Sequence, residues 1–199
     1  MKRRPYGPEA WLVDDVDAPA AWASALGDMD IPGVVEIVPA EGTVVVRCTR
    51  ERHDALGEVL ELVVPRTAGH DTDAPLTIDV VYDGPDIVDI ADAASVSIDD
   101  VIRLHATGSY HVAFCGFSPG FAYLRGIDRR LHVPRRATPR ASVPAGSIGV
   151  AAGYTCVYPS GSPGGWHLIG HTTASLWDVD RDPPALLQPG RAVRFRRAP

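Results

Sequence analysis

The sequence predicts an α+β domain followed by an all-β domain, and three features of the 199 residues lead to that prediction. Strand-like and helix-like segments alternate through the first 83 residues. From residue 107 to 172, short apolar runs are separated by turns that hold 11 of the 19 glycines and 6 of the 18 prolines. Residues 1–100 carry 21 acidic and 7 basic side chains, whereas 101–199 carry 4 acidic and 12 basic ones. We therefore expect a small α+β domain at 1–83 and a second domain at 84–199.

The first domain opens with a strand, a helix and a hairpin. Residues 10–13 form a strand-like run, and Asp17 can cap a helix that continues through Leu26. The β-branched runs 34–38 and 43–47 are separated by four residues that include a proline and a glycine, which is typical of a hairpin.

A second helix and a further strand complete the expected first domain. Residues 50–62 carry apolar side chains at helical spacing, and residues 76–82 alternate as a strand does. Residues 67–75 are expected to form a surface loop between them. The resulting order β-α-β-β-α-β is the ferredoxin-like arrangement.

Two short helices are expected within residues 84–106. Asp86 can cap the first, and Ser97 followed by Asp100 has the capping-box form for the second. The short strands and Gly/Pro turns that come after residue 107 are typical of a β-barrel or sandwich.

Composition excludes several classes of protein. With 45% hydrophobic and 22% charged residues, the chain is neither fibrous nor disordered. Residues 1–4 are basic enough to begin a signal peptide, but Pro5 and Pro8 interrupt the apolar segment that would have to follow. Since no run approaches the roughly 18 apolar residues that span a bilayer, we expect a soluble, cytoplasmic chain with no membrane partner. A net charge of −6 and the lack of an aromatic-basic motif argue against nucleic acid as a partner.

The sequence shows no metal, disulfide or nucleotide-binding motif. Its three cysteines have no Cys-x-x-Cys spacing and are expected to be small buried residues, and its histidines lack metal-ligand spacing. A Walker loop requires a Gly-Lys pair, yet Lys2 is the only lysine. A nucleotide would therefore have to be held by arginines, backbone N–H groups and a partner chain.

The run Gly116-Phe-Ser-Pro-Gly120 fits the Gly-x-Ser-x-Gly pattern of a hydrolase nucleophile elbow. In that device the residue after the serine donates a backbone N–H to the oxyanion, and Pro119 has none. We therefore interpret the run as a turn between two strands that carry aromatic residues.

Six arginines and one acidic residue lie between positions 123 and 140. Arg135 and Arg140 each follow a proline, whose stiff backbone can hold a guanidinium in place. Planar guanidinium groups suit carboxylate or phosphate. For Arg129, Arg130 and Arg136, a solvated basic loop is the favoured interpretation.

Several motifs of the second domain occur together in a fixed order: Gly116-Phe-Ser-Pro-Gly-Phe-Ala-Tyr-Leu124, Pro134-Arg135, Pro139-Arg140, Val143-Pro-Ala-Gly-Ser147, Tyr158-Pro159 and Ser162-Pro-Gly-Gly-Trp166. This series resembles the signature of the allophanate hydrolase subunit 1 family, also called the 5-oxoprolinase B-subunit family, which includes the sporulation-kinase inhibitor. Weaker matches near both ends extend the resemblance over nearly the whole chain.

The resemblance implies a cyclophilin-like β-barrel after the α+β domain. It also implies an ATP-dependent hydrolase of cyclic amide C–N bonds that opens 5-oxoproline to glutamate, or a related allophanate or lactam hydrolase, active with partner subunits. The implied partners are a larger homologous chain, allophanate hydrolase subunit 2 or the 5-oxoprolinase C subunit, and a third component, the 5-oxoprolinase A subunit. ATP would be a co-substrate, with Mg²⁺ held mainly by phosphates or by a partner.

The implied chemistry assigns roles to individual residues. Arg135 and Arg140 are expected to bind the phosphate and the substrate carboxylate, and His105 and Tyr123 to move or position a proton. The residues expected to line the substrate site are Phe117, Pro119, Gly120, Phe121, Ser147, Tyr154, Trp166 and Thr172. No metal ligand is expected.

The chain departs from the family pattern at Tyr154, His171 and Arg191, where the family usually has Gln, Arg and Asp. A paralogue acting on another amide or lactam is therefore an open alternative. Two further alternatives are a regulatory module that binds and inhibits a histidine kinase, and a prolyl isomerase suggested by the barrel alone.

Overall fold

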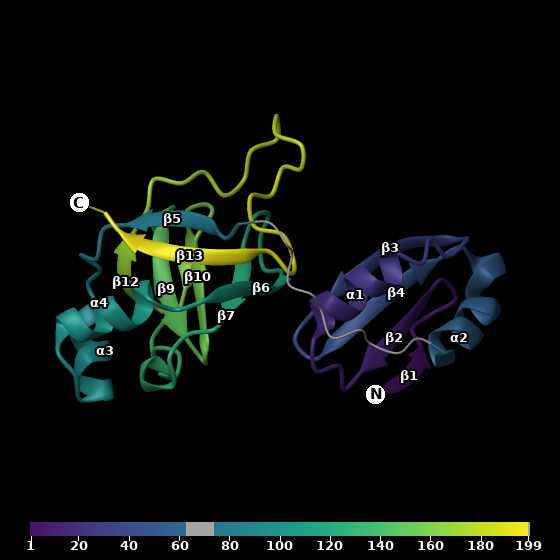
Figure 1. Cartoon of the computed structure of the whole chain (residues 1–199), viewed down its shortest axis with the longest axis horizontal. Helices are drawn as coiled ribbons and strands as arrows, with labels where there is room; N and C mark the ends of the chain where they lie inside the picture. The colour runs from purple at the N-terminus through teal and green to yellow at the C-terminus, as the bar shows by residue number, and fades with distance from the viewer. Residues whose placement is uncertain (63–73, 199) are drawn as a thin grey trace. The chain divides into compact units, whose positions relative to one another are not determined.

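The structure is a computed structural model that describes residues 1–62 and 74–198. The chain divides into two compact units, residues 1–72 and 73–199 (Figure 1). No helix in the described parts is both long and apolar enough to cross a membrane. Most of the loop expected at 67–75 lies outside the described residues.

The first unit is a four-stranded antiparallel sheet in the order β1-β2-β4-β3, with two helices (Figure 1). Side chains from both helices join those of the sheet in one core cluster, in which Trp22 and Leu60 are fully buried. The elements are β1 (Lys2–Pro5), β2 (Ala10–Asp14), α1 (Pro19–Gly27), β3 (Val34–Pro39), β4 (Thr43–Cys48) and, after a 3-10 turn, α2 (His53–Leu62). The residue that caps α1 is Ala18, so Asp17 is not its cap.

The ferredoxin-like detail is not confirmed, because one expected strand lies elsewhere. The strand β5 (Leu76–Val80) pairs in parallel with β13 (Ala192–Arg197) of the second unit, and β1 takes the sheet edge beside β2. Period-2 alternation shows that Leu76–Val80 is a strand but not which sheet it joins. The polar, exposed β1 carries no hydrophobic pattern that could reveal it. The two compact units accordingly divide at 72/73, before β5.

The second unit is built around a seven-stranded sheet in the order β12-β9-β10-β7-β6-β13-β5, antiparallel apart from the β13-β5 pair. Its two edges meet where Val81, directly after β5, exchanges backbone hydrogen bonds of 2.9 Å with His171 of β12. The sheet is therefore nearly closed into a barrel. Its strands are β5, β6 (Tyr110–Cys115), β7 (Ala122–Arg125), β9 (Ser147–Ala151), β10 (Tyr154–Val157), β12 (His167–His171) and β13 (Ala192–Arg197).

Two helices (Figure 1) and a separate pair of strands accompany the barrel. Helix α3 (Ile87–Ala94) packs on β12, and α4 (Ile98–Ala106) packs on β13. The oxygen of Ser97 accepts a hydrogen bond from the Asp100 N–H, which confirms the expected cap of α4. Strands β8 (Arg140–Val143) and β11 (Ser162–Gly164) form a separate two-stranded pair.

Alternate side chains of the barrel strands enter two different clusters. On one face, which we call the core face, Leu124, Ile148 and Ile169 join the main core with Phe195. On the other face, which we call the aromatic face, the side chains of Ala151, Tyr154 and Cys156 pack in a separate cluster. Because successive strand residues point to opposite sides of the sheet, these two clusters have different surroundings.

Candidate functional site

Six aromatic side chains pack together on the aromatic face. Phe121, Tyr154, Tyr158 and Trp166 are buried, while Phe114 and Tyr123 are partly exposed. Tyr123 stacks on Phe114 with ring centroids 4.3 Å apart and meets Trp166 edge-on at 5.7 Å. Phe121 contacts the rings of Tyr123, Tyr158 and Trp166. The structure therefore brings together Phe121, Tyr123, Tyr154 and Trp166, four of the residues that we expected in the site.

Two arginines lie against this aromatic cluster. The guanidinium carbon of Arg135 lies 5.9 Å from the Trp166 ring centroid, and that of Arg125 lies 5.4 Å from the Tyr154 ring centroid. Arg125 also donates hydrogen bonds from Nε and Nη2 to the Tyr154 hydroxyl, at 3.2 and 2.9 Å. Arg135 is exposed and forms no ion pair with a carboxylate of the described residues. A cation held over an indole and open to solvent can receive an anionic group.

Arg140 has a different environment, because it shares the buried carboxylate of Asp86 with Arg136. The Oδ1 atom of Asp86 accepts hydrogen bonds from Arg136 Nη1 and Arg140 Nη2, both at 2.7 Å. Its Oδ2 atom accepts one from the Leu168 backbone N–H, also at 2.7 Å. Burial alone would raise the pKa of Asp86, but the hydrogen bonds from Arg140 and Leu168 outweigh it and hold that pKa below its usual value. Arg140 is thus already paired with a carboxylate within the chain.

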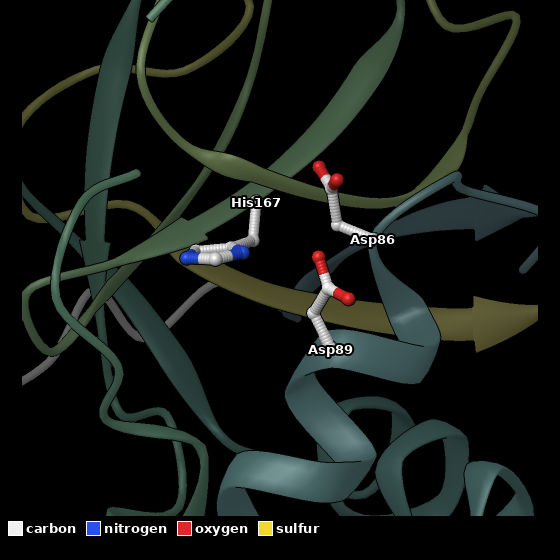
Figure 2. Close-up of side chains that lie close together, drawn as sticks. All are labelled: Asp86, Asp89 and His167. Atoms are coloured by element: carbon white, nitrogen blue, oxygen red, sulfur yellow. The ribbon is translucent and has the colours of Figure 1, made fainter. Parts of the chain in front are cut away.

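Asp86, Asp89 and His167 each offer a ligand atom, and these atoms lie within 4.8 Å of one another. Figure 2 shows the three side chains close together. Such a trio could suggest a metal site. However, two guanidinium groups already occupy Oδ1 of Asp86, and their positive charge opposes a cation. The Nε2 atom of His167 lies 3.2 Å from the Pro134 carbonyl oxygen and is placed to donate to it. Asp86 and Asp89 are therefore part of an ion-pair network with arginines, and the trio is a poor fit to a metal ion.

His105 lies on the core face and is fully buried. Its Nε2 is 3.0 Å from the hydroxyl of Thr155, which itself donates to the Gly149 carbonyl, and its Nδ1 is 2.8 Å from the Tyr82 hydroxyl. The ring therefore donates from Nε2 and accepts at Nδ1, as a neutral imidazole does. Burial lowers its pKa to about 3. The structure does not bring His105 together with the aromatic face, since its partner Thr155 points away from that face.

Three of the remaining expected residues lie in one turn. The exposed ring of Phe117 contacts Phe121 edge-on at 5.2 Å, and its backbone has φ of +75°, which is unusual for a bulky residue. Pro119 and Gly120 belong to the same β6–β7 turn, in which Phe121 N–H donates to the Ser118 carbonyl. This confirms that the Gly-x-Ser-x-Gly run is a turn and not an elbow before a helix.

Ser147 and Thr172 lie beside the turn at Gly146. The Thr172 N–H donates to the Gly146 carbonyl at 2.9 Å, and the Gly146 N–H donates to that of Tyr158 at 2.8 Å. Both Ser147 and Thr172 are buried. A side chain at Gly146, whose φ is +79°, would overlap with the Thr172 carbonyl oxygen, so this turn requires glycine.

Sequence reasoning missed three residues of this region. Asp86 matched a helix cap, yet its side chain makes no capping hydrogen bond. Its arginine partners lie 50 and 54 positions away and Leu168 lies 82 away, so no local pattern could reveal them. The sequence favours a solvated basic loop for Arg136, and it carries no signal for Arg125 beyond the general excess of arginine.

Comparisons with known proteins agree with this architecture. The family profile "Carboxyltransferase domain, subdomain C and D" matches residues 2–187. The 5-oxoprolinase B subunit of Escherichia coli O157:H7 is 42% identical over 186 residues, which cover 87% of this chain and 83% of that protein. The protein of the same name from Bacillus subtilis is 45% identical over 114 residues, covering 57% of this chain and 48% of that protein.

A solved structure shares the fold of nearly the whole chain. The crystal structure of TTHA0988 superposes with a TM-score of 0.81 at 32% identity and covers 96% of this chain. The match spans 40% of the TTHA0988 chain, so the same fold forms less than half of a longer polypeptide there. From the profile, the identity and the fold together, the chain belongs to the carboxyltransferase subdomain C and D family, among the 5-oxoprolinase B subunits.

Proposed function

We propose that this chain is the B subunit of an ATP-dependent 5-oxoprolinase, in which it works with other subunits to open 5-oxoproline to glutamate. Relatives at 42–45% identity bear that name. They favour a component of a hydrolase over a regulator of a histidine kinase. In the structure, the main support is the exposed guanidinium of Arg135 held over Trp166 beside partly exposed Tyr123.

The residues of the aromatic face suit an anionic, flat substrate. A 5-oxoproline molecule has a carboxylate and a planar lactam ring. Arg135 can pair with that carboxylate or with a phosphate, and Trp166 and Tyr123 can pack against the ring. The hydroxyl of Tyr123, a partly exposed residue, is the group on this face that we assign to positioning a proton during attack on the lactam.

A lactam is a poor electrophile, and ATP supplies the activation by phosphorylating the amide oxygen before water attacks the carbon. The part of this chain that fits a phosphate is Arg135, which has no carboxylate partner among the described residues. The Asp86 group does not fit Mg²⁺ because arginines occupy it. We therefore assign Mg²⁺ to the phosphates or to a partner chain.

The partners we propose are the 5-oxoprolinase C subunit, also called allophanate hydrolase subunit 2, and the 5-oxoprolinase A subunit. The relatives are each named as one of several 5-oxoprolinase subunits, which supports an assembly of different chains. The longer TTHA0988 chain supports a physical link between this fold and a further polypeptide segment.

Reconstitution tests the proposal. The purified chain is mixed with the A and C subunits, ATP, Mg²⁺ and 5-oxoproline, and glutamate and ADP are measured together. We expect both products in equal amounts, and neither when ATP or this chain is omitted. Allophanate in place of 5-oxoproline tests the related substrate. Lack of turnover of 5-oxoproline with every combination of subunits would contradict the proposal.

A further inference from the structure

We propose that Asp86 is a positioning residue that holds Arg135 over Trp166. The proposal deepens the function given above and rests on it for its kinetic part. Asp86 is 2% exposed and stands directly before α3, outside the aromatic cluster. Its side-chain hydrogen bonds go to residues close to Arg135 and Trp166 in the sequence, so its effect on that pair is indirect.

Both oxygens of the Asp86 carboxylate accept hydrogen bonds from other residues of the chain. A buried carboxylate is costly unless charged and polar groups surround it. Asp86 accepts three hydrogen bonds of 2.7 Å, two from guanidinium groups and one from a backbone N–H. None of them caps α3, although Asp86 occupies the capping position. The side chain therefore connects α3 to more distant segments instead of stabilising its own helix.

Asp86 connects the segment of Arg135 to the segment of Trp166. Its carboxylate binds Arg136, the residue after Arg135, and Leu168, two residues after Trp166. Its backbone N–H also donates to the Leu168 carbonyl at 3.0 Å, so Asp86 and Leu168 are joined in both directions. One carboxylate thus links the chain segment that presents the cation to the segment that presents the indole ring.

These two segments also contact each other on both sides of Arg135. The Arg136 N–H donates to the Gly165 carbonyl at 2.8 Å, and His167 Nε2 lies 3.2 Å from the Pro134 carbonyl oxygen. Arg140, the second guanidinium on Asp86, belongs to β8, where it lies opposite Gly164 of β11. All of these contacts converge on the stretch that contains Trp166. Without the carboxylate at their centre, the two guanidinium groups would repel each other.

Asp89 offers a matched control on the same helix. It lies 3.7 Å from Arg136 Nη1, but its side chain is 60% exposed, whereas that of Asp86 is 3% exposed. An exposed pair at that distance contributes little. Asp86→Asn and Asp89→Asn remove the same charge from nearly the same place, and only the first should disturb the position of Arg135.

The first measurement needs no activity. In a chain labelled with ¹⁵N-arginine, the Nε–Hε resonance of Arg135 is assigned by its loss in Arg135→Lys. The indole ring current sets its chemical shift as long as Arg135 stays over Trp166. We expect Asp86→Asn to move this resonance toward those of freely exposed arginines, and Asp89→Asn to leave it in place. An unchanged resonance in folded Asp86→Asn would overturn the proposal.

The second measurement uses the reconstituted complex. Because small displacements of a positioned group can cost about 100-fold, we expect Asp86→Asn to lower kcat/KM for 5-oxoproline by about that factor. Asp89→Asn should retain the wild-type value. In a variant that already carries Arg135→Ala, adding Asp86→Asn should cause little further loss of kcat/KM. If the losses in kcat/KM from the two substitutions multiply, Asp86 does not act through Arg135. The same conclusion follows if Asp86→Asn alone keeps the wild-type kcat/KM.

A milder variant covers the case in which Asp86→Asn does not fold. Arg136→Ala removes one of the three contacts and leaves Arg140 and Leu168 on the carboxylate. It should shift the Arg135 resonance in the same direction and lower kcat/KM by a smaller factor, and no change in either would count against the proposal. If the wild-type complex has no turnover, the proposed function fails, while the Arg135 resonance still decides whether Asp86 positions Arg135.

Discussion

Polar side chains have opposite environments on the two faces of the barrel sheet. On the core face, His105 is fully buried, neutral and hydrogen-bonded at both ring nitrogens. On the aromatic face, Arg135 is charged and exposed, and it contacts an indole ring. A polar group whose bonding capacity is used up inside the chain has nothing to offer a ligand. We therefore expect the core face to contribute to stability, and we propose that ligands bind at the aromatic face.

The largest effect is expected at Arg135. Arg135→Ala should lower kcat/KM of the reconstituted complex by about 100- to 1000-fold, the usual cost of removing one electrostatic contact to the reacting charge. Its thermal unfolding should change little because the side chain is exposed. Arg129→Ala, which removes another exposed arginine nearby, serves as the matched control and should behave as the wild type. Wild-type turnover in Arg135→Ala would show that the substrate does not bind at the aromatic face.

His105→Ala should have the opposite effect to Arg135→Ala, because it should lower stability and leave activity nearly unchanged. It leaves a cavity and removes the partners of Tyr82 and Thr155, so we expect the free energy of unfolding to fall by about 3 to 5 kcal/mol. Activity per folded molecule, measured well below the unfolding temperature, should stay close to that of the wild type. Urea unfolding followed by circular dichroism gives the stability. A stable His105→Ala protein with no turnover would instead restore the proton-transfer role that the sequence suggested.

Acid should weaken the core face in a way that depends on His105. Burial lowers its folded pKa to about 3, whereas an unfolded histidine titrates near its ordinary value of about 6.5. The unfolded state therefore binds the proton first as the pH falls. Stability from this residue is complete above pH about 6.5 and is lost by up to about 1.4 kcal/mol per pH unit below it.

Urea midpoints at pH 7 and pH 5 measure this loss of stability. We expect His105→Gln to have a smaller difference between the two midpoints than the wild type. His132→Gln, at an exposed position, should keep the wild-type difference. Equal differences in all three proteins would mean that another group dominates acid unfolding in this range.

The sequence was informative where structure is local and uninformative where partners are distant. Short apolar runs and Gly/Pro turns predicted that the second domain is all-β, and the ordered motifs indicated the family. Phe121, Tyr123 and Trp166 of these motifs lie together in the aromatic cluster, and Arg135 lies against it. By contrast, burial of His105 depends on Tyr82 and Thr155 from other elements, and the pairing of Arg140 depends on Asp86. The destination of β5 depends on β13, more than 100 residues later.

The smallest effect is expected at the edge of the aromatic face, where Arg125 donates two hydrogen bonds to the Tyr154 hydroxyl. Arg125 is exposed, so solvent screens part of the interaction. A double-mutant cycle with Tyr154→Phe and Arg125→Ala should give a coupling energy of about 1 kcal/mol in urea unfolding. A coupling near zero would mean that the ring contact, which Tyr154→Phe preserves, holds Arg125 in place. In that case Arg125 would be held by the Tyr154 ring and not by its hydroxyl, and the contrast between the aromatic face and the hydrogen-bonded core face would be stronger.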